Sequence, residues 1–502
     1  MRPDVIVVGA GACGCVMARR LTEQRNRQTL LLEAGPDYHG RALPADLLDG
    51  GRNSMITHDW GYTHKPNTRQ LRFPYPRGRV VGGSSAVNTC IALRGQPEDY
   101  DEWTSYVPSW SWSSCLPAFK RLERDLDFDD DYHGRDGPLP LRRHPPSEWS
   151  AWQAAFVEAC LGRGFPACDD TNRPGSHGVG PHTMNKVNGQ RVSAAEAYLT
   201  PEVRARENLL LRANCAIRRV LVKNACVQGV EVEAAGVVEQ LQSARVVLCA
   251  GALNTPGILL RSGIGAPQDV ARIGCELVHA LPAVGQRLLD HPGTAIFLRP
   301  RIGGPTRRTD PLIQTVLRYS SGSGHPSDIL LQPGSKLPLP RADIPLLSVM
   351  GAIGKPRGTG SLHFVSAEPH AKPQIVSRLL ENTHDRELAV DAMMLAYELT
   401  QSAAMHKLAA PLWPGRRTLR NRDSVREWIP RACDSGYHPC GTAPMGRDPA
   451  SAVTDERGEV FGIKGLYIAD ASLMPTIPSS NTHVPSLMVA ERIAAWLCTD
   501  LV

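Results

Sequence analysis

The chain has 502 residues, of which 56 are basic and 50 acidic, so its formal charge is +6, and 42% of its residues are hydrophobic. This composition is typical of a globular protein with enough apolar residues for a sizeable core. The small charge excess argues against nucleic-acid binding, and no apolar run is long enough to predict a membrane span. With 45 glycines and 41 prolines, the chain is expected to be rich in loops and special backbone positions.

The N-terminus and the cysteines favour a cytoplasmic protein. Residues 1–4 lead directly into an apolar strand, without the charged and small-residue pattern of a signal peptide. The 13 cysteines are odd in number and form no CxxC pair. We therefore expect reduced, mostly structural cysteines.

The first 35 residues carry a dinucleotide fingerprint. An apolar strand at 5–8 is followed by Gly9, Gly11 and Gly14, then by a helix of small and apolar residues, and a second strand ends at Glu33. Glycines at this spacing let the backbone approach a pyrophosphate at a helix N-terminus, and the acid accepts hydrogen bonds from the ribose. The pattern predicts a bound dinucleotide but does not choose between nicotinamide and flavin.

Three more glycine-rich stretches follow, at 77–90, 245–265 and 465–472. In the second, a buried strand at 245–249 is expected to break into a Gly/Asn/Pro turn and then a short helix at 258–265. In the third, a short strand ends at Asp470. An amphipathic helix is expected from Ser486 to about Leu497. Segments typical of a dinucleotide-binding fold therefore occur at the start, middle and end of the chain.

Taken together, these stretches resemble the glucose–methanol–choline (GMC) oxidoreductases over nearly the whole length. The family's two signatures are matched by 82–88 and 251–265, the segment after the second by 284–292, and the segment of the catalytic histidine by 437–446. The resemblance implies an α/β fold (α+β overall), in which a Rossmann-like FAD-binding domain is assembled from discontinuous segments. It also implies a sheet-and-helix substrate-binding domain.

The domain ranges follow from where the matches fall. The FAD-binding domain is expected to comprise 1–145, 186–293 and 434–502, and the substrate-binding domain 146–185 and 294–433. Within the latter, 360–366 predicts a strand and 384–406 has helical periodicity.

The resemblance also implies the site and its cofactor. His438 is expected to be the base and His483 to orient the substrate oxygen, although the sequence does not settle which of the two takes the proton. Val87 stands where some relatives attach FAD through a histidine, so we expect non-covalent FAD. The expected cofactor-binding residues are Gly9, Gly11, Gly14, Glu33, Ala34, Val81, Gly83, Ser84, Asn88, Thr89, Cys90, Ile91, Ile217, Ala250, Asp470, Ala471, Thr482 and Val484.

Such a site would oxidise a small-molecule alcohol to an aldehyde or ketone. The base takes the hydroxyl proton, hydride passes to flavin N5, and oxygen or another acceptor reoxidises the flavin. Imidazole suits the base because its ordinary pKa is near working pH. Three alternatives stay open: a non-redox relative such as a hydroxynitrile lyase, a nicotinamide-dependent dehydrogenase, and a non-catalytic flavin-binding protein.

Other charged and aromatic groups receive no catalytic role. The acidic stretch 123–131 fits a calcium loop poorly, because Pro140 falls where the bidentate Glu should be, so we expect a solvated loop and no metal. The pairs Arg142-Arg143, Arg218-Arg219 and Arg416-Arg417 are expected to be exposed. Trp110 and Trp112 are expected to pack at a helix start, and Trp60 lies either near the flavin or in the core.

Overall fold

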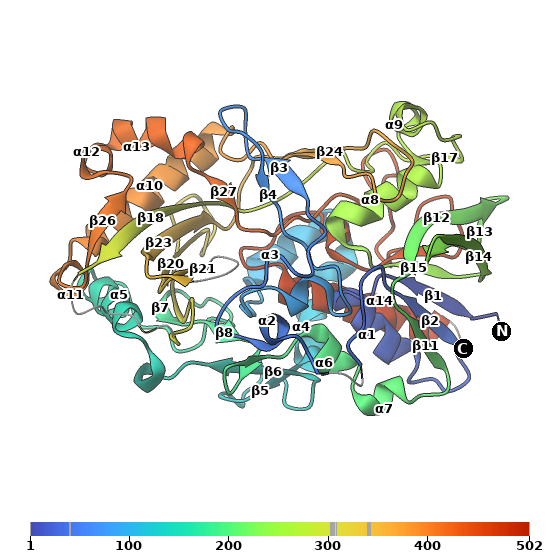
Figure 1. Ribbon diagram of the computed structural model, residues 1–502, viewed down its shortest axis with the longest axis horizontal. Helices are drawn as coiled ribbons and strands as arrows, with labels where there is room; N and C mark the ends of the chain where they lie inside the picture. The colour runs from blue at the N-terminus through green and yellow to red at the C-terminus, as the bar shows by residue number, and fades with distance from the viewer. Residues whose placement is uncertain (1, 40–41, 302–306, 308, 339–342, 501–502) are drawn as a thin grey trace.

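The computed structural model describes residues 2–39, 42–301, 307, 309–338 and 343–500. Two sheets lie at opposite ends of its long axis (Figure 1). The first sheet is wholly parallel, with strand order β11-β2-β1-β15-β28. Its strands are β1 (Val5–Val8), β2 (Thr29–Leu32), β11 (Leu209–Arg212), β15 (Val246–Leu248) and β28 (Leu466–Ile468).

The parallel sheet forms because its strands are short apolar runs that can be buried on both faces. Every residue of β1, β2 and β15 is buried. Helices α1 (Ala12–Leu21) and α14 (His483–Asp500) pack against each other beside this sheet. Helix α14 thus begins at His483, three residues before the expected start at Ser486.

The prediction of a turn after β15 is wrong, because this stretch is helical. Helix α8 (Gly251–Arg261) starts directly after the strand and includes Pro256, while Ile264–Gly265 forms strand β16. A proline inside a helix leaves the carbonyl four residues earlier without its N–H partner. Here the hydroxyl of Thr442 donates to that carbonyl, on Ala252, at 2.6 Å. A distant side chain thus lets the helix continue through the proline.

The second sheet has seven antiparallel strands, in the order β26-β18-β23-β20-β19-β7 with β27 paired to β18. Helices α5 (Ala151–Gly162) and α10 (Thr383–Thr400) pack on it. The helical pattern of 384–406 is divided, because α10 ends at Thr400 and Ser402 caps the short α11 (Ala403–His406). The strands are β7 (Gly178–Pro181), β18 (Pro292–Pro300), β19 (Thr315–Tyr319), β20 (Ile329–Gly334), β23 (Leu347–Ile353), β26 (Ala409–Trp413) and β27 (Asp434–Ser435).

The strand predicted at 360–366 does not join this sheet. It is β24 (Ser361–His363), in a four-stranded sheet of order β24-β25-β3-β4. Its neighbour β25 (Gln374–Val376) pairs with β3 (Thr63–Lys65), which pairs with β4 (Phe73–Pro74). The expected substrate-domain segment therefore pairs with the N-terminal part of the chain. The domain boundaries themselves remain a prediction.

Smaller sheets and short helices complete the fold. An antiparallel sheet joins β12 (Ala216–Lys223), β13 (Cys226–Ala234) and β14 (Val237–Gln242), and another sheet joins β5 (Glu123–Asp125), β6 (Leu139–Arg143) and β8 (Thr183–Met184). The remaining α-helices are α2 (Ala45–Leu48), α3 (Pro97–Asp101), α4 (Trp112–Leu122), α6 (Ala194–Tyr198), α7 (Pro201–Arg204), α9 (Pro267–Arg272), α12 (Arg416–Leu419) and α13 (Arg422–Trp428). Trp110 is buried just before α4 and Trp112 begins it, as predicted.

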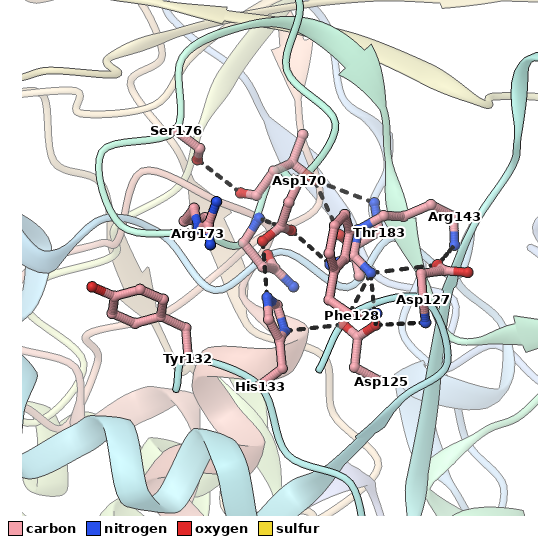
Figure 2. Close-up of polar contacts among 12 residues, drawn as sticks. Asp125, Asp127, Phe128, Tyr132, His133, Arg143, Asp170, Arg173, Ser176 and Thr183 are labelled. Atoms are coloured by element: carbon pink, nitrogen blue, oxygen red, sulfur yellow. Dashed lines mark hydrogen bonds and ion pairs between the residues drawn. The ribbon is translucent and has the colours of Figure 1, made fainter. Parts of the chain in front are cut away.

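The expectation of a solvated acidic loop holds for Asp127, Asp129 and Asp131, which are exposed, but not for the start of the stretch. Glu123, Asp125 and His133 are buried, and Figure 2 shows His133 between Asp125 and Asp170. His133 Nδ1 lies 3.0 Å from Asp125 Oδ2, and its Nε2 lies 2.9 Å from Asp170 Oδ2. Arg143, expected to be exposed, is buried and pairs with both aspartates.

This cluster is a buried ion network. Glu123, Asp125 and His133 are close enough together to hold a metal ion, but Arg94 already pairs with Glu123, and Arg143 with Asp125. Burial opposes a charge on His133, but its hydrogen bonds to Asp125, Asp170 and Glu123 raise its pKa to about 10. The three buried carboxylates, Glu123, Asp125 and Asp170, then face three cations, and Asp127 and Asp130 lie at the edge of the cluster.

All 13 cysteines are free thiols in the structure, and most are buried. Among the residues described, no helix combines the length and apolar character that crossing a membrane requires.

Candidate functional site

A cavity of about 920 Å³ connects the glycine turn of the parallel sheet with the antiparallel sheet. Its walls include Gly9 and Gly11 at one end and residues of β18, β20 and β23 at the other. The cavity is therefore shared by segments far apart in the sequence.

The glycine turn fits a dinucleotide phosphate. Gly9 has φ +95°, and a Cβ there would meet the carbonyl of Cys249 at 2.6 Å. A Cβ on Gly14 would lie 1.8 Å from the carbonyl of Gly9, so this glycine lets α1 pack close to the turn. No side chain caps α1 at its N-cap, Gly11, which leaves its first N–H groups for an anion.

Glu33 stands at the end of β2, as the fingerprint requires. Its Oε2 accepts from the N–H of Ala10 at 2.9 Å and its Oε1 from that of Gly35 at 2.8 Å. Burial raises the pKa of Glu33 to about 7, against the lowering effect of these two hydrogen bonds. Each oxygen keeps a further lone pair for a ribose hydroxyl. The turn and the acid together fit FAD.

Asp470 holds other elements in place. Its Oδ2 accepts from Gly251 N–H and Thr255 hydroxyl, at the start of α8, and its Oδ1 accepts from Ser472. Burial raises the pKa of Asp470. The carboxylate therefore fixes the N-terminal turns of α8 and of the 3₁₀ helix Ala471–Leu473 beside the cavity.

The structure brings most of the predicted site residues to the cavity wall. Those that line it are Gly9, Gly11, Glu33, Ala34, Gly83, Ser84, Asn88, Thr89, Ile91, Ile217, Ala250, Asp470, Ala471, Thr482, His438 and His483. Four others are buried and do not line the cavity: Gly14, Val81, Cys90 and Val484. Val87 and Trp60 also line the cavity.

His438 is held at three points. Its Nδ1 lies 2.9 Å from Nδ1 of His291, its Nε2 lies 2.9 Å from Nδ2 of Asn481, and its main-chain N–H donates to Oδ1 of Asp290. Burial, followed by His291 and by the charge of Arg77, lowers the pKa of His438 well below its ordinary value. The ring is therefore neutral near pH 7.

His483 begins α14 and lines the same cavity. Its Nε2 is buried and has no hydrogen-bond partner within the described part of the chain. Burial, and then the charge of Arg191, lowers the pKa of His483 to about 4. A buried polar atom without a partner is costly in a folded protein, so this nitrogen is free to serve a ligand.

Two neighbours of His438 were not predicted as site residues. His291 follows Asp290 in the matched segment 284–292, and Asn481 stands two residues before His483. His291 and His438 are 147 positions apart, and their contact depends on how three chain segments meet. The nearest signal in the sequence was the match of 284–292 to the family.

The antiparallel sheet supplies a mostly apolar wall. Ala295 and Phe297 come from β18, Met350 and Ala352 from β23, and Trp413 from β26. Gln332 of β20 is a polar member of this wall, and its side-chain oxygen bonds to His182. A small, largely apolar molecule would fit against these residues.

Comparisons with known proteins agree with this geometry. Two GMC oxidoreductase family models match residues 3–293 and 356–490. The 5-(hydroxymethyl)furfural oxidase of a Methylovorus species is 33% identical and covers 99% of both chains. An oxygen-dependent choline dehydrogenase of Photobacterium profundum is 31% identical over 98% of this chain and 92% of its own.

Solved structures of related enzymes have the same fold as this chain. Pyridoxine 4-oxidase from Mesorbium loti superposes with a TM-score of 0.91, at 28% identity, over 99% of both chains. Formate oxidase, at 21% identity, shares the fold with a TM-score of 0.89. With FAD as the cofactor, the nicotinamide alternative falls away. The chain belongs to the GMC oxidoreductase family and is an FAD-dependent enzyme of that family.

Proposed function

We propose that this enzyme oxidises a small alcohol to an aldehyde or ketone, with His438 as the base and His483 as the hydrogen-bonding partner of the substrate oxygen. One observation carries the proposal. Two neutral imidazoles line the cavity that also contains the dinucleotide turn: Nε2 of His483 has no partner among the described residues, and Nε2 of His438 contacts the side-chain amide of Asn481.

The division of work follows from the contacts of each ring. His438 Nε2 accepts a hydrogen bond from Asn481 Nδ2, so this nitrogen carries a lone pair, and that lone pair can accept the hydroxyl proton when the substrate displaces the amide. His483 Nε2 has no partner among the residues described, and with its hydrogen on this nitrogen it can donate to the substrate oxygen as negative charge develops there. Bound FAD supplies the hydride acceptor. Val87 offers no nucleophile at the cavity wall, which supports non-covalent FAD.

The apolar wall indicates the kind of alcohol. Phe297, Met350 and Trp413 offer flat or adaptable surfaces to a planar ring. The related oxidases are named for a furan and a pyridine alcohol. We propose that the substrate is a ring-bearing primary alcohol and that oxygen or another electron acceptor reoxidises the flavin.

The test is to mix the enzyme anaerobically with a panel of ring-bearing and aliphatic alcohols. Reduction of the bound flavin is monitored by the loss of its absorption band. We expect the band to bleach with a furan or aryl methanol in the wild-type enzyme. His438→Ala should keep bound FAD and lose bleaching by about 100-fold or more.

His177→Ala is the matched control, because it removes an exposed imidazole outside the cavity. Wild-type rates in His438→Ala would contradict the role of the base. A yellow protein that no alcohol bleaches would favour the non-redox or non-catalytic alternatives. Peroxide formation on reoxidation would identify oxygen as an acceptor.

A further inference from the structure

His291 is a buried imidazole that touches three segments of the chain. Its Nδ1 lies 2.9 Å from Nδ1 of His438. On the other side of the ring, Nε2 lies 3.0 Å from the carbonyl oxygen of Gly354 and 3.1 Å from that of Pro478. Only 3% of the residue is exposed, and His291 does not itself line the cavity.

These partners determine where the protons are. Carbonyl oxygens only accept hydrogen bonds, so Nε2 of His291 carries a hydrogen. Burial lowers the pKa of His291, so the ring is neutral and its Nδ1 has a lone pair. The hydrogen between the two rings therefore belongs to Nδ1 of His438. Because His438 is also neutral, its Nε2 has no hydrogen, in agreement with the amide of Asn481 facing it.

The same contacts fix the position of the base. The carbonyl of Pro478 lies three residues before Asn481, so His291 binds both His438 and the segment that bears its other partner. The carboxylate of Asp290 accepts from the main chain of His438, from Tyr75 and from Ser435. His438 thus has a neutral imidazole at Nδ1 and no direct hydrogen bond from its ring to a carboxylate among the described residues.

We propose that His291 is a positioning residue that holds His438 in the tautomer with hydrogen on Nδ1 and a lone pair on Nε2. The proposal rests on the proposed function of His438 as the base. Without an acceptor at Nδ1, the hydrogen could move to Nε2 and the ring could no longer take a proton there.

The proton step involves only these groups: the O–H bond of the alcohol breaks and its proton forms a bond to the lone pair of Nε2 of His438. The electron pair left on oxygen would form the C=O bond as the carbinol hydrogen departs as hydride, for which FAD would supply the acceptor. His438 becomes a cation whose Nδ1–H still donates to His291, which stays neutral. The wrong tautomer of a catalytic histidine is known to be very costly in other enzymes.

Two substitutions separate the two contacts of His291. His291→Asn places an amide oxygen near the position of Nδ1 and keeps an acceptor for His438. His291→Gln places an amide N–H near the position of Nε2 and keeps a donor for the carbonyls, but offers His438 no acceptor. We expect the rate of flavin reduction in His291→Asn to stay within about 5-fold of the wild-type rate. In His291→Gln we expect this rate to fall by about 10- to 100-fold, as for other residues that orient a catalytic group.

The activity comparison should be made on FAD-loaded enzyme at equal flavin content. Equal losses in both variants, or a faster His291→Gln, would overturn the proposal, because a purely structural role depends on the contacts with the carbonyls. A melting temperature for each variant shows whether either loss reflects unfolding.

The tautomer can be observed without turnover. In FAD-loaded enzyme with ¹⁵N-labelled histidine, the His438 signals are those that disappear in His438→Gln. We expect them to show hydrogen on Nδ1 in the wild type and in His291→Asn, and a larger share of hydrogen on Nε2 in His291→Gln. Hydrogen on Nε2 in the wild type would overturn the proposal. If the expected tautomer is seen but His438→Ala stays active, the proposed function fails instead.

Discussion

The hydroxyl of Thr442 donates a 2.6 Å hydrogen bond to the main-chain carbonyl of Ala252. Pro256 lies four residues after Ala252 and has no N–H to give this carbonyl. Thr442 is fully buried and follows His438 by four residues. One hydrogen bond therefore joins the segment of the proposed base to helix α8 beside the cofactor cavity.

Replacing Thr442 by Val should destabilise the protein by about 1–3 kcal/mol, because a similar volume remains but a buried carbonyl loses its donor. The change should appear as a lower urea midpoint. Thr442→Ser keeps the hydroxyl and serves as the control. If the valine variant has the same midpoint as the serine variant, another donor serves Ala252.

Gly436→Ala should displace the proposed base. A Cβ at Gly436 would lie 2.9 Å from Nδ1 of His438 and 3.3 Å from Cβ of His291, so one of the rings must move. We expect flavin reduction to fall by about 10- to 100-fold with FAD retained, since a displacement near 1 Å can cost this much. Gly415→Ala is the matched control, because nothing lies within 4 Å of its added Cβ. Unchanged reduction would show that the rings tolerate the methyl group.

The sequence was most informative where local chemistry determines the structure. The spacing of Gly9, Gly11 and Gly14 before Glu33 reflects contacts within one strand–turn–helix unit, and the structure has that unit. The family resemblance placed His438 and His483 together although they are 45 positions apart. No local pattern of a single chain could have shown that pairing.

Predictions failed where a side chain distant in the sequence changes the secondary structure or the burial that the local residues favour. The stretch 251–257 resembles a turn because of its Gly, Asn and Pro, yet it is helical with Thr442 serving the free carbonyl. The acidic stretch resembles a solvated loop, but at its start Arg94 neutralises Glu123 and Arg143 neutralises Asp125, which allows these two carboxylates to be buried. His291 stayed unassigned because its role depends on atoms from three segments.

Flavin reduction should keep its full rate well below the ordinary pKa of histidine. The base must be unprotonated, and burial lowers the pKa of His438 well below its usual value and that of His483 to about 4. Protonation of His483 thus begins only below about pH 5. Stopped-flow reduction from about pH 8 down to pH 5 should show no loss near pH 6.5. A decline with an apparent pKa of about 6.5 or higher would mean that the site is more hydrated than its burial indicates.

His133→Gln should destabilise the protein most at low pH. Its hydrogen bonds to Asp125, Asp170 and Glu123 raise the pKa of His133 to about 10 despite burial, from about 6.5 in the unfolded chain. The charged ring therefore contributes fully below about pH 6.5, and its contribution is lost as the pH rises through 10, by at most about 1.4 kcal/mol per pH unit. Other charged groups also face the cluster, namely Asp127, Asp130, Arg94 and Arg143. The wild type and the His133→Gln variant share these groups, so their titration contributes to both proteins. The gap between wild-type and variant urea midpoints should thus be wide at about pH 6 and narrow towards pH 10. A gap that stays constant would mean that His133 is neutral in the folded protein.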